Sequence, residues 1–389
     1  GQAWAWARVT EGNVLRNQAL TAGWKPSRTV SVDSGRLIHN LCGRPVQLAT
    51  PHFISDGCAT NPQNATILAN THGMAHKAAD NNHRSKQTGP AHSMRMRLML
   101  LGGGNALGQA LIRLGAEEDI GFLAPKPPQD GWDAASLTQL LDDTRPDALI
   151  NLAYYFDWFQ AEAVSETRLA AQEFAIERLA ELCQHHNITL LQPSSYRVFD
   201  GSRATAYSEK DEPVPLGLRG QALWRIEQSV RATCPQHVML RFGWLLDDSV
   251  DGTLGRFLAR AEKPDELLMA DDRRGNPTPV DDAARVIISV LKQLDCAAPL
   301  WGRYHYAGHE ATTPLALGQA ILTEARNYHP LAIESPTAQA HAARPDAADE
   351  PQHAVLACKK ILHTFGIKPR AWRAGLPALL DRFYRHGQT

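Results

Sequence analysis

The spacing of hydrophobic residues changes near residue 96. Residues 1–93 mix Asn, His, Thr, Gly and Pro with isolated tryptophans and show little sustained period of 2 or 3.6. We expect them to form a poorly ordered extension, the alternative being a small extra domain. The folded unit is expected to begin at Met94 or Met96, where regular apolar runs start.

From there on, short apolar runs typical of buried strands alternate with segments of helical spacing. The predicted strands cover residues 96–101, 120–124, 148–153, 188–192 and 237–242. The predicted helices cover 107–114, 137–141 (with Ser136 as N-cap), 161–185 and 220–232. Strict alternation predicts an α/β fold, a Rossmann-like doubly wound parallel sheet with helices on both faces.

The rhythm loosens after about residue 245, where Pro, Asp and Gly become more frequent. We therefore expect residues 94–245 to form an NAD(P)-binding Rossmann-like domain. Residues 246–389 are expected to form a small C-terminal substrate-binding lobe, interleaved with the end of the sheet.

The composition removes several classes of function. A net charge of −1 over 389 residues gives no electrostatic footprint for nucleic acid or a membrane surface. The six cysteines form no CxxC pair, so neither a metal site nor a disulfide scaffold is predicted. The expected setting is the cytoplasm.

A glycine-rich turn follows the first predicted strand. The segment Gly102-Gly-Gly-Asn-Ala-Leu-Gly108 stands between that strand and a predicted helix, the context in which such loops hold a dinucleotide pyrophosphate. The candidate cofactor-binding residues here are Gly102, Gly104, Asn105, Ala106, Leu107 and Gly108. Asn105 stands where glycine is frequent, and Asn tolerates a positive φ. The alternative is an ordinary strand-to-helix turn.

The end of the second predicted strand bears on the choice of cofactor. An acid there would bind the ribose 2′-hydroxyl of NAD, whereas a base suits the 2′-phosphate of NADP. The chain has Ala124-Pro-Lys126 and no acid, which favours NADP(H) over NAD(H) with Lys126 as the phosphate partner. An ordinary solvated lysine is the alternative.

Several short motifs occur in order after residue 96. They include Arg145-Pro-Asp-Ala-Leu-Ile-Asn-Leu-Ala153, Ser194-Ser-Tyr-Arg-Val-Phe-Asp-Gly201, Tyr207-Ser-Glu-Lys-Asp211, Asp272-Arg-Arg-Gly-Asn-Pro-Thr278 and Ala343-Arg-Pro345. In order and spacing they resemble the extended short-chain dehydrogenase/reductases, and within them the dTDP-4-dehydrorhamnose reductase family. The second motif resembles the family's Ser-Thr-Asp-Tyr-Val-Phe-Asp-Gly segment.

This resemblance implies a set of site residues. On the cofactor side it implies Asp133 near the adenine amine, or as a helix cap, together with Asn151 and Ala153. On the side of a nucleotide-sugar substrate it implies Trp244, Arg273, Arg274 and Thr278, with a core tryptophan and a solvated basic turn as the alternatives.

The resemblance also implies the catalytic positions. Family members use a Ser or Thr to hold the substrate oxygen, a Tyr to donate a proton, and a Lys four residues on to lower the pKa of that Tyr. In this chain Ser195 falls on the first position, Arg219 on the Tyr position and Leu223 on the Lys position. Because the pKa of arginine exceeds about 12, Arg219 cannot deliver a proton.

Other residues could take over these roles. Tyr196 is a candidate substitute acid, as are Tyr154 and Tyr155, although adjacent aromatics more often serve packing. Arg219 could pair with a diphosphate or a carboxylate, or form a salt bridge with a surface acid.

The residues and the resemblance together imply two alternative functions. The first is an NAD(P)- and nucleotide-sugar-binding protein that is catalytically impaired and has a binding or regulatory role. The regulatory beta subunit of methionine adenosyltransferase is a similar case, and a homodimer or a regulatory partner protein would be the assembly. The second is an active NADP-dependent dTDP-4-dehydrorhamnose reductase, or a related sugar-nucleotide reductase or epimerase, with a rearranged proton donor.

The extension predicted at residues 1–93 can be tested by hydrogen exchange. We expect its amides to exchange rapidly, because the segment lacks the apolar periodicity needed to bury backbone hydrogen bonds. Strong protection across residues 1–93, measured by mass spectrometry, would instead indicate a folded domain.

Overall fold

The computed structural model of the chain describes residues 96–154, 165–296 and 300–386. The expectations for residues 1–93, for Tyr155 and for the first residues of the helix predicted from Ala161 lie outside these segments.

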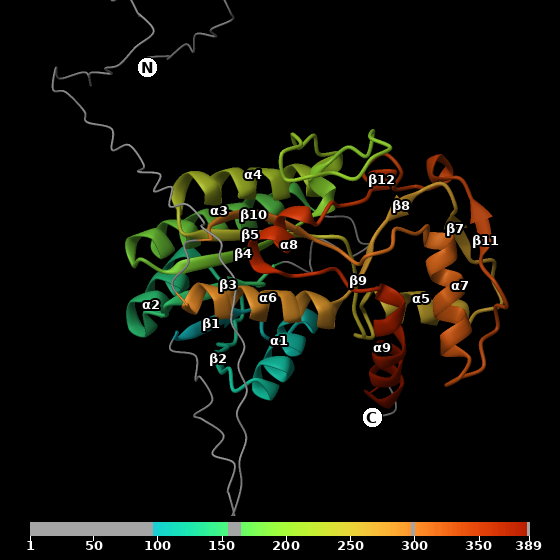
Figure 1. The fold of residues 1–389 in the computed structure, drawn as a ribbon, viewed down its shortest axis with the longest axis horizontal. Coiled ribbons are helices and arrows are strands. Elements are labelled where there is room, and N and C mark those ends of the chain that lie inside the picture. Colours follow the sequence, from blue (N-terminus) through green and yellow to red (C-terminus); the bar gives the residue numbers. More distant parts are fainter. Residues whose placement is uncertain (1–95, 155–164, 297–299, 387–389) are drawn as a thin grey trace, which may run out of the picture. The chain divides into compact units, whose positions relative to one another are not determined.

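A six-stranded parallel sheet forms the centre of the described chain (Figure 1). Its strands are β1 (Leu98–Leu101), β2 (Phe122–Leu123), β3 (Ala148–Asn151), β4 (Thr189–Ser195), β5 (His237–Phe242) and β10 (Gly302–Tyr306). They lie in the order β2-β1-β3-β4-β5-β10, with every neighbouring pair parallel. Because the strand order reverses beside β1, the switch point of the sheet lies there, where ligands of such folds bind.

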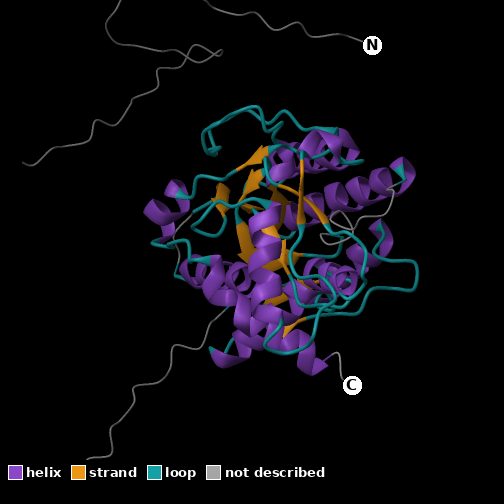
Figure 2. Cartoon of the chain, turned by 90° about the vertical axis from the view of Figure 1, so that its right-hand side faces the viewer, coloured by secondary structure: helices purple, strands orange, loops and turns teal. Residues whose placement is uncertain are grey.

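Helices cover both faces of the sheet, as predicted (Figures 1 and 2). One face carries α2 (Ala134–Thr144), α3 (Glu166–His185) and α4 (Gly217–Thr233). The other carries α1 (Ala106–Glu117), α6 (Val280–Asp295) and α8 (Lys359–Phe365). The strands read as continuous apolar runs because successive side chains enter two different cores: Leu98 and Leu100 face α1, whereas Met99 and Leu101 face α3.

The Ser136 cap predicted for α2 was wrong by about one turn, whereas the alternative role of Asp133 as a helix cap is confirmed. Asp133 is the N-cap, and its carboxylate accepts a hydrogen bond from the Ser136 amide at 2.8 Å. Ser136 lies inside the helix and completes a capping box by accepting from the Asp133 amide at 3.0 Å. Asp outcompetes Ser here because the negatively charged cap also interacts favourably with the helix dipole.

A second group of elements packs beside the carboxyl ends of the strands and forms the lobe. It contains α5 (Thr253–Ala261), α7 (Pro314–Ala325), α9 (Trp372–His386) and three short parallel strand pairs. The pairs are β6 (Trp244–Leu246) with β9 (Pro277–Pro279), β7 (Leu268–Ala270) with β11 (Thr337–Gln339), and β8 (Arg274–Gly275) with β12 (His353–Ala354). Residues beyond 245 therefore supply both this lobe and α6, β10 and α8 of the sheet layer.

Among the helices in the described segments, none combines the length and the apolar character needed to cross a bilayer.

A buried ion pair joins α4 to the sheet. The Arg241 guanidinium donates to both oxygens of Glu227, with Nε–Oε1 at 2.7 Å and Nη2–Oε2 at 2.5 Å, and both residues are at most 1% exposed. Ser194 Oγ donates to the same carboxylate at 2.6 Å. The remaining Arg241 nitrogen Nη1 lies 3.3 Å from His305 Nε2, and His305 Nδ1 lies 3.1 Å from the Tyr207 carbonyl oxygen.

The protonation of this network follows from its burial. Burial lowers the pKa of His305 well below its usual value, and the neighbouring Arg241 charge lowers it further. His305 therefore stays neutral, accepting from Arg241 through Nε2 and donating from Nδ1 to the Tyr207 carbonyl.

Removing one partner of the Glu227–Arg241 pair should destabilise the protein strongly. Arg241→Met leaves the buried Glu227 carboxylate with only the more distant Arg303 guanidinium, 3.8 Å away, and should cost about 3–5 kcal/mol of unfolding free energy. Urea denaturation measures the change, and Arg178→Met on the exposed surface of α3 is the control, expected within about 0.5 kcal/mol of the parent. Equal stability of the two variants would contradict the expectation.

Candidate functional site

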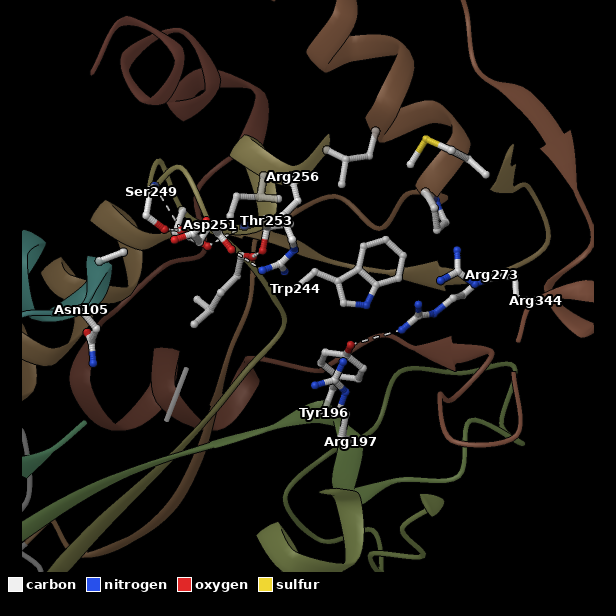
Figure 3. A pocket seen from close by; sticks show the side chains of 18 of the residues that line it. Asn105, Tyr196, Arg197, Trp244, Ser249, Asp251, Thr253, Arg256, Arg273 and Arg344 are labelled. Carbon is white, nitrogen blue, oxygen red and sulfur yellow. Dashed lines mark hydrogen bonds between the residues drawn. The ribbon is translucent and has the colours of Figure 1, made fainter. Parts of the chain in front are cut away.

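A cavity of about 510 Å³ lies where the glycine loop, the end of β4 and the lobe meet (Figure 3). From the sheet domain it is lined by Gly104, Asn105, Ala106, Tyr196 and Arg197. From the lobe it is lined by Trp244, Leu245, Leu246, Asp247, Ser249, Asp251, Gly252, Thr253, Arg256, Met269, Arg273, Pro314, Leu317 and Arg344. The cavity opens outside the carboxyl ends of β1 and β4, as expected for a ligand site in a parallel sheet.

The glycine loop is shaped by close packing on the end of β3. Gly102 has a φ of +82°, and a Cβ there would lie 2.5 Å from the Leu152 carbonyl oxygen. A Cβ on Gly108 would overlap the Gly102 carbonyl oxygen, so α1 can approach the turn only with glycine at both positions. Leu107 anchors the first turn of α1 in the core.

Asn105 does not have the positive φ that the sequence analysis allowed for. Its φ is −84°, and it is the N-cap of α1. Oδ1 accepts from the Gly108 amide at 2.9 Å, while Nδ2 donates to the Leu152 carbonyl oxygen at 3.0 Å. The side chain thus ties the glycine loop to the end of β3, and the left-handed turn belongs to Gly102 alone within this loop.

The other predicted cofactor residues lie along the same edge of the sheet. Lys126 is exposed beyond β2. Asn151 is buried at the end of β3, where Nδ2 donates to Gln192 Oε1 at 2.8 Å and Oδ1 accepts from the Ala153 amide at 3.3 Å. Asp133 is the N-cap of α2. Their contacts with a cofactor stay predictions.

The residues at the predicted catalytic positions carry little acid–base chemistry. Ser195 is fully buried, and its Oγ accepts from the Arg197 amide at 3.3 Å, which caps the short 3-10 helix η2 (Tyr196–Val198). Leu223 is 1% exposed and packs in the core between α4 and the sheet. Arg219 is half-buried in the first turn of α4.

Tyr196 is held in a cluster around Glu350. Its hydroxyl donates to Glu350 Oε2 at 3.2 Å. It also accepts from Arg273 Nη2 at 3.2 Å, the contact drawn as a dashed line in Figure 3. Arg273 Nη2 also donates to Glu350 Oε2 at 2.6 Å, and Arg197 pairs with Oε1 of the same carboxylate. One buried carboxylate therefore joins the end of β4 to the lobe.

The protonation states in this cluster are set by burial and charge. Burial alone would raise the pKa of Glu350, but the Arg197 and Arg273 guanidinium groups more than offset it and hold that pKa below its usual value. Burial, reinforced by the Glu350 charge, raises the pKa of the Tyr196 phenol despite the arginines nearby. Glu350 is thus ionised and Tyr196 neutral at pH 7.

The predicted substrate-side residues separate into two groups. Trp244 and Arg273 face the cavity together, with the guanidinium carbon 5.1 Å from the indole centroid. Arg274 is exposed on β8, and Thr278 is buried, donating to the Asn276 carbonyl and accepting from the Gly308 amide, each at 3.2 Å. Neither of the latter two lines the cavity, so their substrate contacts stay predictions.

Three residues of this site were not predicted from the sequence. Glu350, Arg344 and Arg197 surround Tyr196, yet Glu350 lies more than 150 residues from it in the chain. Arg197 could have been found, because it stands in a motif where the compared family has a tyrosine. Within the described segments, no group of three or more His, Cys, Asp or Glu side chains could hold a metal ion.

A doubly wound parallel sheet, a glycine turn at its switch point and a cavity covered by a second lobe together define a Rossmann-type nucleotide-binding protein. Comparison with known families identifies the particular group. Residues 96–385 match the model described as the RmlD substrate binding domain, and the chain belongs to this family.

Curated relatives agree with this assignment. A dTDP-4-dehydrorhamnose reductase of Aggregatibacter actinomycetemcomitans is 27% identical over 286 residues, covering 72% of this chain and 97% of that protein. A second, from Sinorhizobium fredii, is 25% identical over 280 residues, covering 71% of this chain and 94% of the relative.

Solved structures share the fold. A dTDP-4-dehydrorhamnose reductase from Clostridium acetobutylicum superposes with a TM-score of 0.64 at 21% identity, covering 74% of this chain and 99% of the other. The enzyme from Bacillus anthracis, solved in complex with NADP, gives 0.61 at 19% identity, covering 74% and 99%. A UDP-glucose 4-epimerase from Thermotoga maritima, solved with UDP-glucose, gives 0.60 at 14% identity, covering 76% and 100%.

The packing of the glycine loop generates a prediction. Gly102→Ala places a Cβ at a positive φ and against the Leu152 carbonyl, which should cost at least about 1–3 kcal/mol of unfolding free energy. Gly121→Ala is the matched control, because nothing lies within 4 Å of a Cβ at that position. Urea denaturation of the two variants measures the difference, and a Gly102→Ala protein as stable as the control would show that the loop is shaped otherwise.

Proposed function

We propose that this protein binds NADP(H) and a nucleotide-linked sugar but reduces the sugar only poorly, and that it serves a binding or regulatory role. The observation that carries the proposal is the pair of residues at the family's proton-donor positions. A guanidinium stands at residue 219 and a buried leucine at residue 223, where the motif register calls for Tyr and Lys.

The cofactor half of the cavity suits a dinucleotide. Gly104, Asn105 and Ala106 line the cavity at the start of α1, where amide groups and the helix dipole favour phosphate. Lys126 is exposed beyond β2 and is the residue we assign to a 2′-phosphate, which favours NADP(H) over NAD(H). When bound, the cofactor supplies the hydride.

The lobe half of the cavity suits a nucleotide-sugar. Trp244 offers an aromatic face for a base, and Arg273 and Arg256 add positive charge suited to a diphosphate. Relatives in the family are dTDP-4-dehydrorhamnose reductases, so a thymidine-linked 4-keto sugar is the first ligand to test.

Catalysis is impaired because the alkoxide formed by hydride transfer needs a proton donor. Arg219 stays charged: burial and the Arg197 charge lower its pKa, but guanidinium does not deprotonate in proteins. Leu223 can neither lower a neighbouring pKa nor hydrogen-bond a ribose. Tyr196 is the strongest substitute, but burial, and to a lesser extent the Glu350 charge, raises its pKa, whereas the family lysine lowers that of its tyrosine.

The second candidate is an active reductase that uses Tyr196 as its acid. This reading is favoured by the position of Tyr196 in the cavity lining, beside the Ser195 position. The two candidates differ in turnover and in the effect of Tyr196→Phe, which should abolish activity only if the phenol donates the proton.

Turnover of NADPH with a dTDP-4-keto-6-deoxy sugar tests the proposal. We expect slow oxidation by the parent protein and a gain of about tenfold or more in Arg219→Tyr with Leu223→Lys, because the pair restores the donor and its activating cation. Each single variant is a control that supplies only half of the pair. Rapid oxidation by the parent, lost in Tyr196→Phe, would overturn the proposal in favour of the second candidate.

A further inference from the structure

The wall of the cavity beside Ser195 carries more positive charge than a neutral sugar requires. Arg197 lines the cavity directly after Tyr196, and its side chain is only 11% exposed. In the motif at residues 194–201, Arg197 stands where the compared family has a tyrosine, as Arg219 does in the next segment. Two neutral phenols are thus replaced by two guanidinium groups.

These two arginines belong to neighbouring elements, and of the two only Arg197 lines the cavity. The first turn of α4 packs so closely on η2 that a Cβ at Gly220 would lie 2.5 Å from the Arg197 carbonyl oxygen. Arg219, one residue earlier, interacts electrostatically with both Arg197 and Glu350. Arg219 therefore adds its charge to the electrostatic field at Arg197 without itself lining the cavity.

The acids nearby do not cancel the cations. Four arginines interact through the cluster: Arg197, Arg219, Arg273 and Arg344. Three carboxylates face them: Glu350, Asp346 and Asp349. Both oxygens of Glu350 and both of Asp346 already accept guanidinium donors, so the cluster is ordered before any ligand arrives and keeps an excess of one positive charge.

The position of this excess positive charge indicates which part of a nucleotide-sugar would carry the matching anion. Arg256, which lines the cavity from α5 of the lobe, suits the diphosphate. Arg197 instead lies two residues after Ser195, and Arg219 lies in the first turn of α4. These are the positions at which the proposed function puts the reacting part of the sugar. An anion bound there belongs to the sugar ring.

We propose that the sugar carries a carboxylate, so that the ligand is a nucleotide-linked hexuronate, bound through Arg197 with Arg219 reinforcing the positive field. The planar guanidinium fork matches a carboxylate, and its several N–H groups allow one arginine to serve Glu350 and a ligand together. This inference rests on the proposed function, because it assumes that a nucleotide-sugar occupies the cavity.

Calorimetric titration of the parent protein with matched ligands tests the inference without a variant. UDP-glucose and dTDP-glucose are titrated first to find the base that binds. The hexose and the hexuronate of that base, which differ only in a CH₂OH or a carboxylate at C6, are then compared. We expect the hexuronate to bind about tenfold tighter or more, as for a hydrogen bond to a charged group, and the preference to shrink at high salt.

Substitution of Arg219 supplies a second measurement of the preference for the hexuronate. Arg219→Met should reduce the preference for the hexuronate severalfold while leaving hexose binding nearly unchanged. Arg178→Met, on the exposed surface of α3, is the matched control and should keep the full preference. Arg219 is chosen over Arg197 because loss of Arg197 would leave buried Glu350 short of one partner.

The outcomes distinguish failure of the carboxylate site from failure of the proposed nucleotide-sugar role. Equal affinity for hexose and hexuronate, or a preference unchanged in Arg219→Met, would overturn the carboxylate site and leave the proposed function standing. Failure of all of these nucleotide-sugars to bind, with intact NADPH binding, would overturn the nucleotide-sugar role and the carboxylate site with it.

Discussion

The buried pair between Glu227 and Arg241 sets the position of α4 on the sheet. Glu227 is on α4, Arg241 is on β5, and the Ser194 hydroxyl on β4 donates to the same carboxylate. Because the pair is desolvated, a shift of the helix by one residue would leave two buried charges unmatched. Residues 223 and 219 therefore lie one and two turns before a fixed point, so the pair sets where both residues lie relative to the sheet.

The same constraint positions the helix that carries residues 219 and 223. A leucine at residue 223 fits the core because α4 already buries that face against α3 and the sheet. Arginine at residue 219 stays in the first, half-exposed turn of α4. The buried pair holds the backbone of α4 at Glu227, in the second half of the helix.

Most of the sheet domain could be predicted from the sequence because its information is local. Apolar runs within residues 98–101 and 148–151 predict strands that are buried on both faces. The glycine turn between strand and helix indicates the switch point of the sheet. The cap of α2 was misplaced because Asp133 and Ser136 are both good caps and cooperate in one box. Asn105 was misread because a propensity for positive φ cannot show which residue of a glycine turn needs it.

The cavity was only partly predictable because half of its wall comes from distant segments. Trp244 and Arg273 were found through motifs, but no periodicity or spacing points to Glu350, whose role depends on three-dimensional proximity to Tyr196 and Arg197. Buried charge pairs of this kind leave no local pattern, since either partner alone reads as a solvated side chain.

The order of elements along the chain has a consequence for how the molecule could be divided. The last strand of the sheet, β10, comes after α5 and after the lobe strands β6, β7, β8 and β9 in the chain. Helix α8 comes later still. A fragment ended after β5 would expose that strand as an unprotected edge and leave the α1 face without α6. The nucleotide-binding half is therefore not a separable module, and domain shuffling could only have transferred both halves as one piece.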